Sequence, residues 1–285
     1  MEHHAVLHTC AWLEEQGFRV TYLPVDEWGA AAPESVERAM TEETILVSVM
    51  TANNEVGTIE PIAEIAAIAH AHGAFFHTDA VQAAAHIPLD VKALGVDALS
   101  LSGHKFYGPK GIGALYLRRG TPIAEFMQGG AQERAMRAGT ENTAAIVGMG
   151  MAAELAAKNM QTGMAVLAEL RKRLLEGIRT IEGSWLNGPE KGRLPGNVNF
   201  GIAGISSEAL LIRLDLTGFA VSGGSACSAG SIEPSHVLLA MGQDAKKAGS
   251  AVRVSLGRYS TRADVEAFLR ALGRIVREIR KVQET

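Results

Sequence analysis

Polar side chains follow three apolar segments of the sequence, at the points where predicted strands end. The segments are "TILVSVMTANNEVG" (44–57), "AFFHTDAVQ" (74–82) and "VDALSLSGHK" (96–105). The polar residues at their ends are Asn53, Asn54, Glu55, His77, Asp79, Gln82, Ser102, His104 and Lys105. In open α/β sheets, ligands bind outside the carboxyl ends of the strands. We therefore expect one site that contains an acid, amides, an imidazole and an amine.

This set of groups suits pyridoxal phosphate. The Lys105 amine could form a Schiff base with the cofactor aldehyde. The Asp79 carboxylate could hold the proton on the pyridine nitrogen, which makes the ring a better electron sink. Amide and hydroxyl donors from Asn54, Gln82 and Ser102 could orient the ring oxygen and the phosphate.

Interpretations without a cofactor also stay open for the same residues. A lysine in a Gly/Pro turn is usually only solvated. His77 and Asp79 share one face of a strand and could bind a metal, but no third ligand with suitable spacing is evident. Amides such as those of Asn54 and Gln82 cap turns in many proteins. The convergence of several strand ends favours the cofactor site.

The two cysteines have different settings. Cys227 lies in "VSGGSACSAGS" (221–231), where glycine and serine dominate and no helical or strand period survives. That composition predicts a loop, and a thiol in such a loop suggests a chemical role. Cys10 lies on one stripe of a predicted helix with Leu7 and Leu13. It is therefore expected to be a small buried apolar residue.

Strands alternate with helices in the first half of the chain. The predicted strands are 18–25, 44–50, 74–81, 96–102 and 111–119, and the predicted helices between them are 32–40 and 61–73. Such alternation favours a largely parallel sheet that is covered on both faces. The fold class is therefore α/β.

The second half of the chain predicts a smaller domain. Two helical stretches, 143–160 and 165–181, lead out of the first domain. Beyond Gly183 we predict strands at 194–202, 218–227 and 251–259, with amphipathic helices at 206–216 and 262–282. The expected domains are 1–157, with a mostly parallel sheet, and 158–285, of α+β type.

Composition narrows the function classes. The 285 residues carry a formal net charge of −4 and no long basic run, which argues against direct nucleic-acid binding. No apolar run reaches the length of about 18 residues that a membrane-spanning helix needs, and no secretory leader is evident. These features predict a cytoplasmic protein with no membrane partner.

The same segments resemble a known enzyme family. "HTDAVQAAAHIPLDV" and "SLSGHKFYGPKGIGALYLRRG" are similar to the cysteine desulfurases, pyridoxal-phosphate enzymes of the aminotransferase class V group. The similarity continues through "TANNEVGTIEPI", "MRAGTENTAAIVGMGMA" and "SGGSACSAGSIEPSHVLLAMG", and the last segment resembles the NifS/IscS-type branch. The resemblance implies the aspartate aminotransferase-like fold (fold type I), with a large cofactor-binding domain and a small domain that carries the cysteine loop.

The resemblance also implies a role for each matching position. Lys105 matches the lysine that binds the cofactor, Asp79 the partner of the pyridinium and Gln82 the donor to the ring oxygen. His3 matches a histidine that stacks on the ring and takes part in proton transfer. Ser102 and His104 match phosphate contacts, and Thr140 matches a phosphate contact from the neighbouring subunit of a homodimer. Asn54 matches a residue near both the cofactor and the substrate carboxylate, and Arg253 matches the residue that binds that carboxylate. A guanidinium suits that carboxylate, because its planar fork binds both oxygens.

In this family the loop thiol accepts sulfur. The resemblance implies that Cys227 attacks the sulfur of L-cysteine, leaving a persulfide on the protein and releasing L-alanine. The sulfur would then pass to an acceptor such as an iron–sulfur scaffold protein or a thiolation pathway. Cys227 could be shared with an iron–sulfur cluster on that scaffold, and no resident metal is expected in the protein itself.

One departure from the family concerns the amino end. Relatives begin well before the "EHHAVL" segment, and their first segment supplies a strand, a helix and a turn that grips the cofactor phosphate. The chain is therefore expected to be an N-terminally truncated member or one that has lost this anchor, with apolar surface uncovered on the sheet. The alternatives to a desulfurase are another class V enzyme, either a selenocysteine lyase or an aminotransferase, and a non-catalytic remnant.

Overall fold

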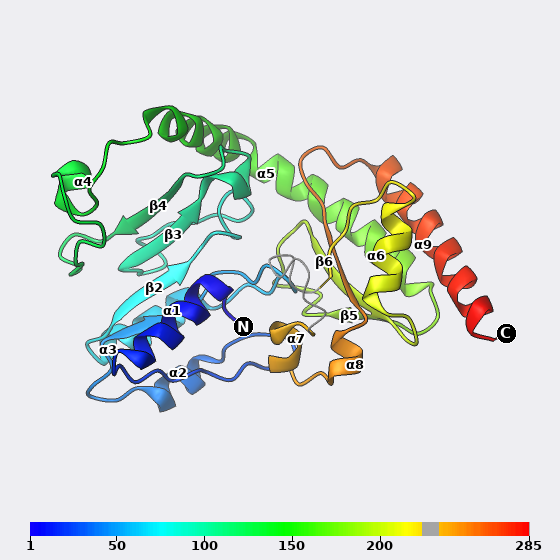
Figure 1. The fold of residues 1–285 in the computed structure, drawn as a ribbon, viewed down its shortest axis with the longest axis horizontal. Coiled ribbons are helices and arrows are strands. Elements are labelled where there is room, and N and C mark those ends of the chain that lie inside the picture. The colour runs from blue at the N-terminus through cyan, green and yellow to red at the C-terminus, as the bar shows by residue number, and fades with distance from the viewer. Residues whose placement is uncertain (224–233, 285) are drawn as a thin grey trace. The chain divides into compact units, whose positions relative to one another are not determined.

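A computed structural model describes residues 1–223 and 234–284 of the chain (Figure 1). The chain divides into two compact units, which we describe separately. The first unit comprises residues 1–35, 52–60 and 161–285, and the second comprises 36–51 and 61–160. The predicted boundary at 157/158 stays a prediction. The compact units meet along the chain at 160/161, and two N-terminal segments belong to the same unit as the C-terminal residues.

The second unit is built on a four-stranded sheet in the order β1-β2-β3-β4. Its strands are β1 (Leu46–Ser48), β2 (Phe75–Asp79), β3 (Ala98–Ser102) and β4 (Gly113–Leu117). The first three are parallel and β4 is antiparallel to β3, so the sheet is mostly parallel as predicted. A short 3-10 helix, η1 (Gly103–Phe106), follows β3 directly.

Helices and irregular segments complete this unit. They are α2 (Pro33–Ala39), which begins in the first unit, α3 (Ile62–Ala71), α4 (Gln132–Ala135) and the first half of α5 (Thr143–Arg179). Ile62, Ile65, Ala66 and Ala69 form the buried side of α3, while large apolar side chains stay exposed elsewhere in the unit. The latter include Leu46, Leu115, Val147 and Met151. Leu46 and Leu115 belong to strands β1 and β4, and Val147 and Met151 belong to α5.

The first unit contains a three-stranded antiparallel sheet in the order β5-β6-β7. Its strands are β5 (Ser184–Asn187), β6 (Asn197–Ile202) and β7 (Ala251–Ser255), and every residue of the central strand β6 is buried. The helices are α1 (His4–Glu15), α6 (Ser207–Asp215), α7 (His236–Ala240), α8 (Ala245–Ala248) and α9 (Arg262–Gln283), with the end of α5. This α+β arrangement agrees with the prediction.

The core of the first unit lies between this sheet and α5, α6 and α9. Phe200 and Ile202 of β6 pack with Leu174 of α5, Leu210 of α6 and Leu272 of α9, all fully buried. The helix α9 begins at a capping box, in which Thr261 and Asp264 exchange hydrogen bonds. Its buried residues recur at the three- and four-residue spacing of an amphipathic helix.

Several element predictions need correction. Residues 18–25 form no strand in the structure, because they make no ladder hydrogen bonds with the described residues. The stretches 143–160 and 165–181 belong to one continuous helix, α5, and β5 was not predicted at all. Cys10 is half-buried instead of buried, since α1 has no buried residue. No described helix is long and apolar enough to cross a membrane.

Candidate active site

Asp79 lies at the carboxyl end of the central strand β2. Its Cα pairs with that of Ser100 in β3, and its carbonyl oxygen accepts a hydrogen bond from the Thr51 N–H at 2.9 Å. The side chain is 8% exposed, and its Oδ1 accepts from the Val81 N–H at 2.9 Å. The strand pairing therefore holds a buried carboxylate at the carboxyl-terminal end of the parallel strands, where the sequence predicts one.

Lys105 lies in η1, which follows the carboxyl-terminal end of the neighbouring strand β3. The turn is closed by Tyr107 in the left-handed region (φ 69°) and by a hydrogen bond from the Gly108 N–H to the Gly103 carbonyl at 2.9 Å. A Cβ at position 108 would lie 2.9 Å from that carbonyl oxygen, so only glycine fits without a shift. This tight turn places the half-buried Lys105 within a few residues of the paired strand ends.

The predicted phosphate contacts belong to the same unit. The Ser102 hydroxyl is hydrogen-bonded to Nδ1 of His104 at 2.9 Å, and His104 is exposed. Gln82 is half-buried in the turn that follows β2. Thr140 lies farther along the chain, exposed, in the irregular segment before α5. The structure thus brings Asp79, Ser102, His104 and Lys105 to adjacent strand ends, but Thr140 does not come from such an end.

His77 is held by hydrogen bonds on both sides of its ring. Its Nδ1 is 2.8 Å from the Ser48 hydroxyl of β1, and its Nε2 is 2.9 Å from the Ser100 hydroxyl of β3. Burial lowers the pKa of His77, against the opposing effect of Asp79. A neutral imidazole with both nitrogens bonded is a structural bridge between strands and not a metal ligand.

Asn54 and Arg253 come together in the first unit. The Arg253 guanidinium on β7 donates to the Asn54 carbonyl oxygen at 2.9 Å. The backbone of Arg253 also exchanges two hydrogen bonds with Ser222, at 2.7 and 3.1 Å. The guanidinium is therefore held at the Asn54 carbonyl, and the backbone of Arg253 is held at Ser222.

His3 caps the helix α1 in the same unit. Its Nδ1 accepts a hydrogen bond from the Ala5 N–H at 3.1 Å, so a neutral His3 carries its proton on Nε2. The imidazole of His3 forms an edge contact with that of His4, with ring centroids 6.4 Å apart. Cys227, the predicted sulfur acceptor, lies outside the described residues.

Sequence reasoning missed the polar network that holds the turn 53–58. Glu55 is 1% exposed, and its carboxylate accepts a hydrogen bond from the Ser235 hydroxyl at 2.5 Å. Burial raises the pKa of Glu55, and the Ser235 bond and the charge of Arg253 oppose that shift. The Asn197 and Asn199 amides both donate to the Glu55 carbonyl at 3.1 Å. Two asparagines on one face of a buried strand were the available signal.

The predicted site residues therefore form two groups. One group, around Lys105 and Asp79, lies in the second unit, and the other, around Asn54 and Arg253, lies in the first. The first group offers an amine and a buried acid, and the second group offers a guanidinium for a carboxylate.

Comparisons with known proteins identify the family of the chain. The family model described as aminotransferase class-V matches residues 1–268. A cysteine desulfurase IscS of Methanosarcina thermophila is 51% identical over 282 residues, which cover 99% of this chain and 70% of that protein. A cysteine desulfurase of Gluconacetobacter diazotrophicus is 45% identical, with coverage of 99% and 71%.

The fold is also similar to that of solved structures from this family. A NifS-like protein superposes with a TM-score of 0.90 at 38% identity, covering 96% of this chain and 73% of the other. The sequence and the fold are thus both similar to those of pyridoxal-phosphate enzymes over nearly the whole chain. The chain belongs to the aminotransferase class-V family, in its NifS/IscS-like cysteine desulfurase branch.

Proposed function

We propose that the protein is a cysteine desulfurase that converts L-cysteine to L-alanine and moves the sulfur to Cys227. The observation that carries the proposal is the placement of an amine and a buried acid at adjacent parallel strand ends. Asp79 pairs with Ser100 in the ladder, and Lys105 follows in the tight turn after the same strand. An amine and a carboxylate so placed are the two groups that a pyridoxal ring requires.

The residues of the second unit fit pyridoxal phosphate. The Asp79 carboxylate would hold the pyridinium proton, and its burial favours a short charge-assisted hydrogen bond. The Lys105 amine would bind the cofactor covalently, Gln82 would donate to the ring oxygen, and Ser102 and His104 would contact the phosphate. When bound, the cofactor supplies an electron sink for the bonds at the substrate Cα.

Other residues of the chain would bind the substrate and carry protons. Arg253 would bind the substrate carboxylate, and its bond to the Asn54 carbonyl orients the guanidinium for that task. Asn54 would add a contact to the same carboxylate. His3 would stack on the cofactor ring and exchange a proton at Nε2, because its Nδ1 is occupied by the Ala5 N–H.

Cys227 would accept the sulfur as a thiolate. Its sulfur forms a bond with the sulfur of L-cysteine, and the substrate Cβ–S bond breaks. The electron pair of that bond stays with the carbon fragment, which takes up protons and leaves as L-alanine, while Cys227 keeps the persulfide. The thiolate, not the thiol, is the attacking form.

Partners and location extend the same proposal. Thr140 would contact the phosphate of the neighbouring subunit, so we expect a homodimer. A sulfur-acceptor protein, such as an iron–sulfur scaffold, would receive the persulfide sulfur from Cys227 and could share that thiol with its cluster. A cytoplasmic location remains a prediction from the sequence.

Two measurements test the function. Purified protein with added pyridoxal phosphate should show a visible absorbance band that Lys105→Ala removes, and identical spectra would refute the cofactor site. Cys227→Ala should abolish release of alanine from L-cysteine while the band persists. Alanine release that survives in Cys227→Ala would refute the role of Cys227 as the sulfur acceptor. A cofactor band without alanine release from L-cysteine in the wild type would instead favour another class V enzyme, either a selenocysteine lyase or an aminotransferase.

A further inference from the structure

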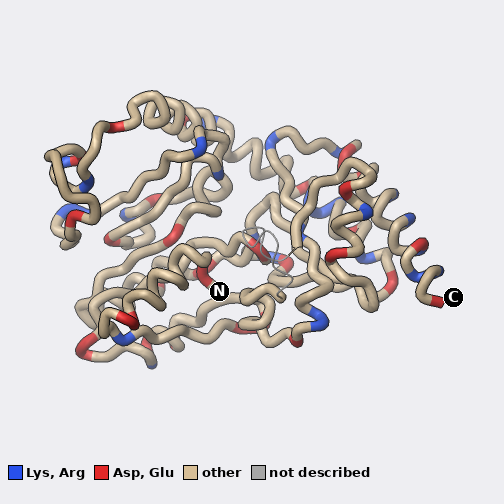
Figure 2. Tube along the Cα trace, viewed as in Figure 1, with Lys and Arg blue, Asp and Glu red and all other residues tan. Residues whose placement is uncertain are grey.

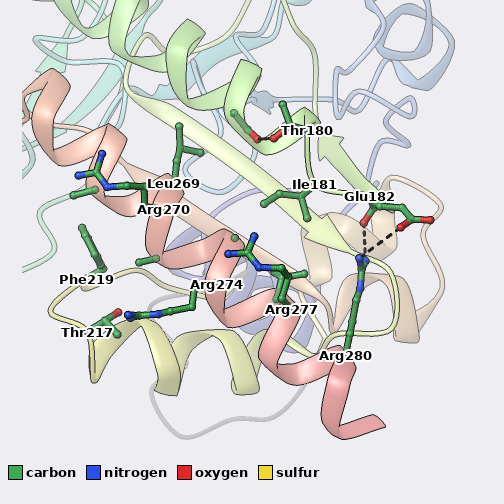
Figure 3. A pocket seen from close by; sticks show the side chains of 15 residues that line it. Thr180, Ile181, Glu182, Thr217, Phe219, Leu269, Arg270, Arg274, Arg277 and Arg280 are labelled. Carbon is green, nitrogen blue, oxygen red and sulfur yellow. Dashed lines mark hydrogen bonds and ion pairs between the residues drawn. The ribbon is translucent and has the colours of Figure 1, made fainter. Parts of the chain in front are cut away.

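A groove on the first unit has four arginines among its lining residues. It lies between the end of α5, the end of α6 and the exposed side of α9, and its volume is about 1040 Å³. Figure 3 shows Arg270, Arg274, Arg277 and Arg280 following one another along α9. The only acidic residue among those that line it is Glu182.

The sign of the charge in this groove opposes that of the protein. The helix α9 carries six basic and three acidic residues, a net charge of +3, in a chain whose formal net charge is −4 (Figure 2). A solvated helix face usually intersperses both signs. Four arginines gathered beside one carboxylate therefore indicate an anionic ligand.

The arginines are only loosely paired within the protein. Arg274 lies 3.9 Å from Glu278, which is also 3.6 Å from Arg213. The Arg280 guanidinium donates a 2.6 Å hydrogen bond to the Glu182 carbonyl oxygen, but it lies 4.0 Å from the carboxylate of that residue, whose side chain is 95% exposed. The ion-pair distances of Arg274 and Arg280 exceed the 2.7–2.9 Å typical of charge-assisted hydrogen bonds, so both guanidinium groups can still bind a closer carboxylate.

Arg277 is exposed on α9, as Arg270 is. It forms no ion pair with the residues that the structure describes. Its guanidinium lies over Gly273, one turn earlier on α9, where a Cβ would be 3.6 Å from it.

Apolar side chains line the groove between the charges. Ile181, Phe219 and Leu269 are among its lining residues (Figure 3). Leu269 packs directly on α5 at Gly177, where a Cβ would lie 2.3 Å from Leu269 Cδ1. The close helix contact forms a firm base for the groove. Arginine and apolar surface together fit a ligand that is both acidic and apolar.

The dimensions favour a peptide over a single small anion. Residues 270 to 280 of α9 span about 15 Å at the helical rise of 1.5 Å per residue. Carboxylates at positions i, i+4 and i+7 of a partner helix would meet successive arginines, and apolar residues between them would contact Ile181 and Leu269. A nucleic acid is less suited, because the chain as a whole is acidic.

We propose that this groove, defined by Arg270, Arg274, Arg277 and Arg280 with Ile181 and Leu269, binds an acidic amphipathic segment of a partner protein. The inference goes beyond the proposed function, because the groove includes none of the residues assigned to the active site. Its affinity is expected to fall steeply with salt, since the contacts are exposed and screened within about 10 Å at 0.1 M ionic strength.

Fluorescence anisotropy of the full chain tests the proposal. The probe is a labelled synthetic helix with glutamates at i, i+4 and i+7 and leucines between them. Wild-type protein should bind it at low salt, and the double variant R270E/R277E should bind at least tenfold more weakly, because two attractions become repulsions. The matched control K158E/K246E changes the net charge equally at two exposed lysines and should leave binding unchanged.

The outcomes separate this proposal from the desulfurase assignment. Equal loss of binding in both double variants, no binding to wild type, or tighter binding of a labelled single-stranded oligonucleotide would each overturn it. Alanine release from L-cysteine should be unchanged in R270E/R277E, because these residues lie outside the proposed active site. A protein without desulfurase activity could still pass the peptide test, so the two failures are distinguishable.

Discussion

The buried residue Glu60 should make the first unit less stable as the pH rises from 5 to 8.5. Its carboxyl is 5% exposed, and Oε2 accepts one hydrogen bond from the Ala31 N–H at 2.9 Å. Oε1 has no hydrogen-bond partner among the described residues. Burial therefore raises the pKa of Glu60 to about 7, against a usual value of 4.5.

The sign of the effect follows from proton linkage. Between pH 4.5 and pH 7 the folded state retains a proton that the unfolded state has lost, so stability falls as pH rises through this window and levels off above it. Each pKa unit corresponds to about 1.4 kcal/mol. We therefore expect Glu60 to remove about 2 to 3 kcal/mol of unfolding free energy between pH 5 and pH 8.5.

The variant Glu60→Gln isolates this contribution, because the amide keeps an acceptor for the Ala31 N–H and cannot ionise. All three tryptophans, Trp12, Trp28 and Trp185, belong to the first unit, so their fluorescence during urea unfolding reports its stability. The unfolding free energy of the variant, relative to that of wild type, should rise by about 2 to 3 kcal/mol between pH 5 and pH 8.5. The exposed control Glu169→Gln should not. A constant difference across this range would refute the reasoning.

Three further variants test local packing and the turn at the candidate site. A Cβ at Gly201 would lie 2.2 Å from the Trp185 ring, so Gly201→Ala should cost about 1–3 kcal/mol in urea unfolding. Ser235→Ala leaves the buried Glu55 carboxylate without its 2.5 Å hydrogen bond and should cost about 1–3 kcal/mol at pH 8, but less in acid, where Glu55 is protonated. Gly108→Ala must shift the turn after β3. An absorbance titration should then show pyridoxal phosphate binding that is weaker by about tenfold or more. Unchanged binding would show that this turn does not position the Lys105 amine.

Strands could be predicted from the sequence where apolar runs are buried by their neighbours. Segment 74–81 became β2 because helix α3 and two flanking strands cover it. Segment 18–25 has equally strong strand propensity, yet Phe18 and Tyr22 are both about half-exposed and the segment makes no ladder bonds with described residues. Propensity alone does not supply a pairing partner.

The opposite error, a strand that was not predicted, occurred at β5. Its four residues, Ser184–Asn187, alternate weakly and carry no strong local signal, but antiparallel pairing with β6 makes them a strand. The same limit applies to the site. The rule that ligands gather at strand ends identified Asp79 and Lys105, whereas the asparagines that fix the turn around Glu55 depend on contacts from residues more than 140 positions away.

The hydrogen-bonded row Ser48–His77–Ser100 has a consequence for folding of the parallel sheet. Sliding any one of these strands by a single residue would turn its polar side chain to the opposite face and break the row. Apolar residues alone would tolerate such slippage more easily than two directional bonds to one imidazole. The row thus selects the one alignment in which Asp79, the last residue of β2, lies opposite Ser100, two residues before the end of β3. This alignment sets the positions of the Asp79 carboxylate and of the turn that carries Lys105.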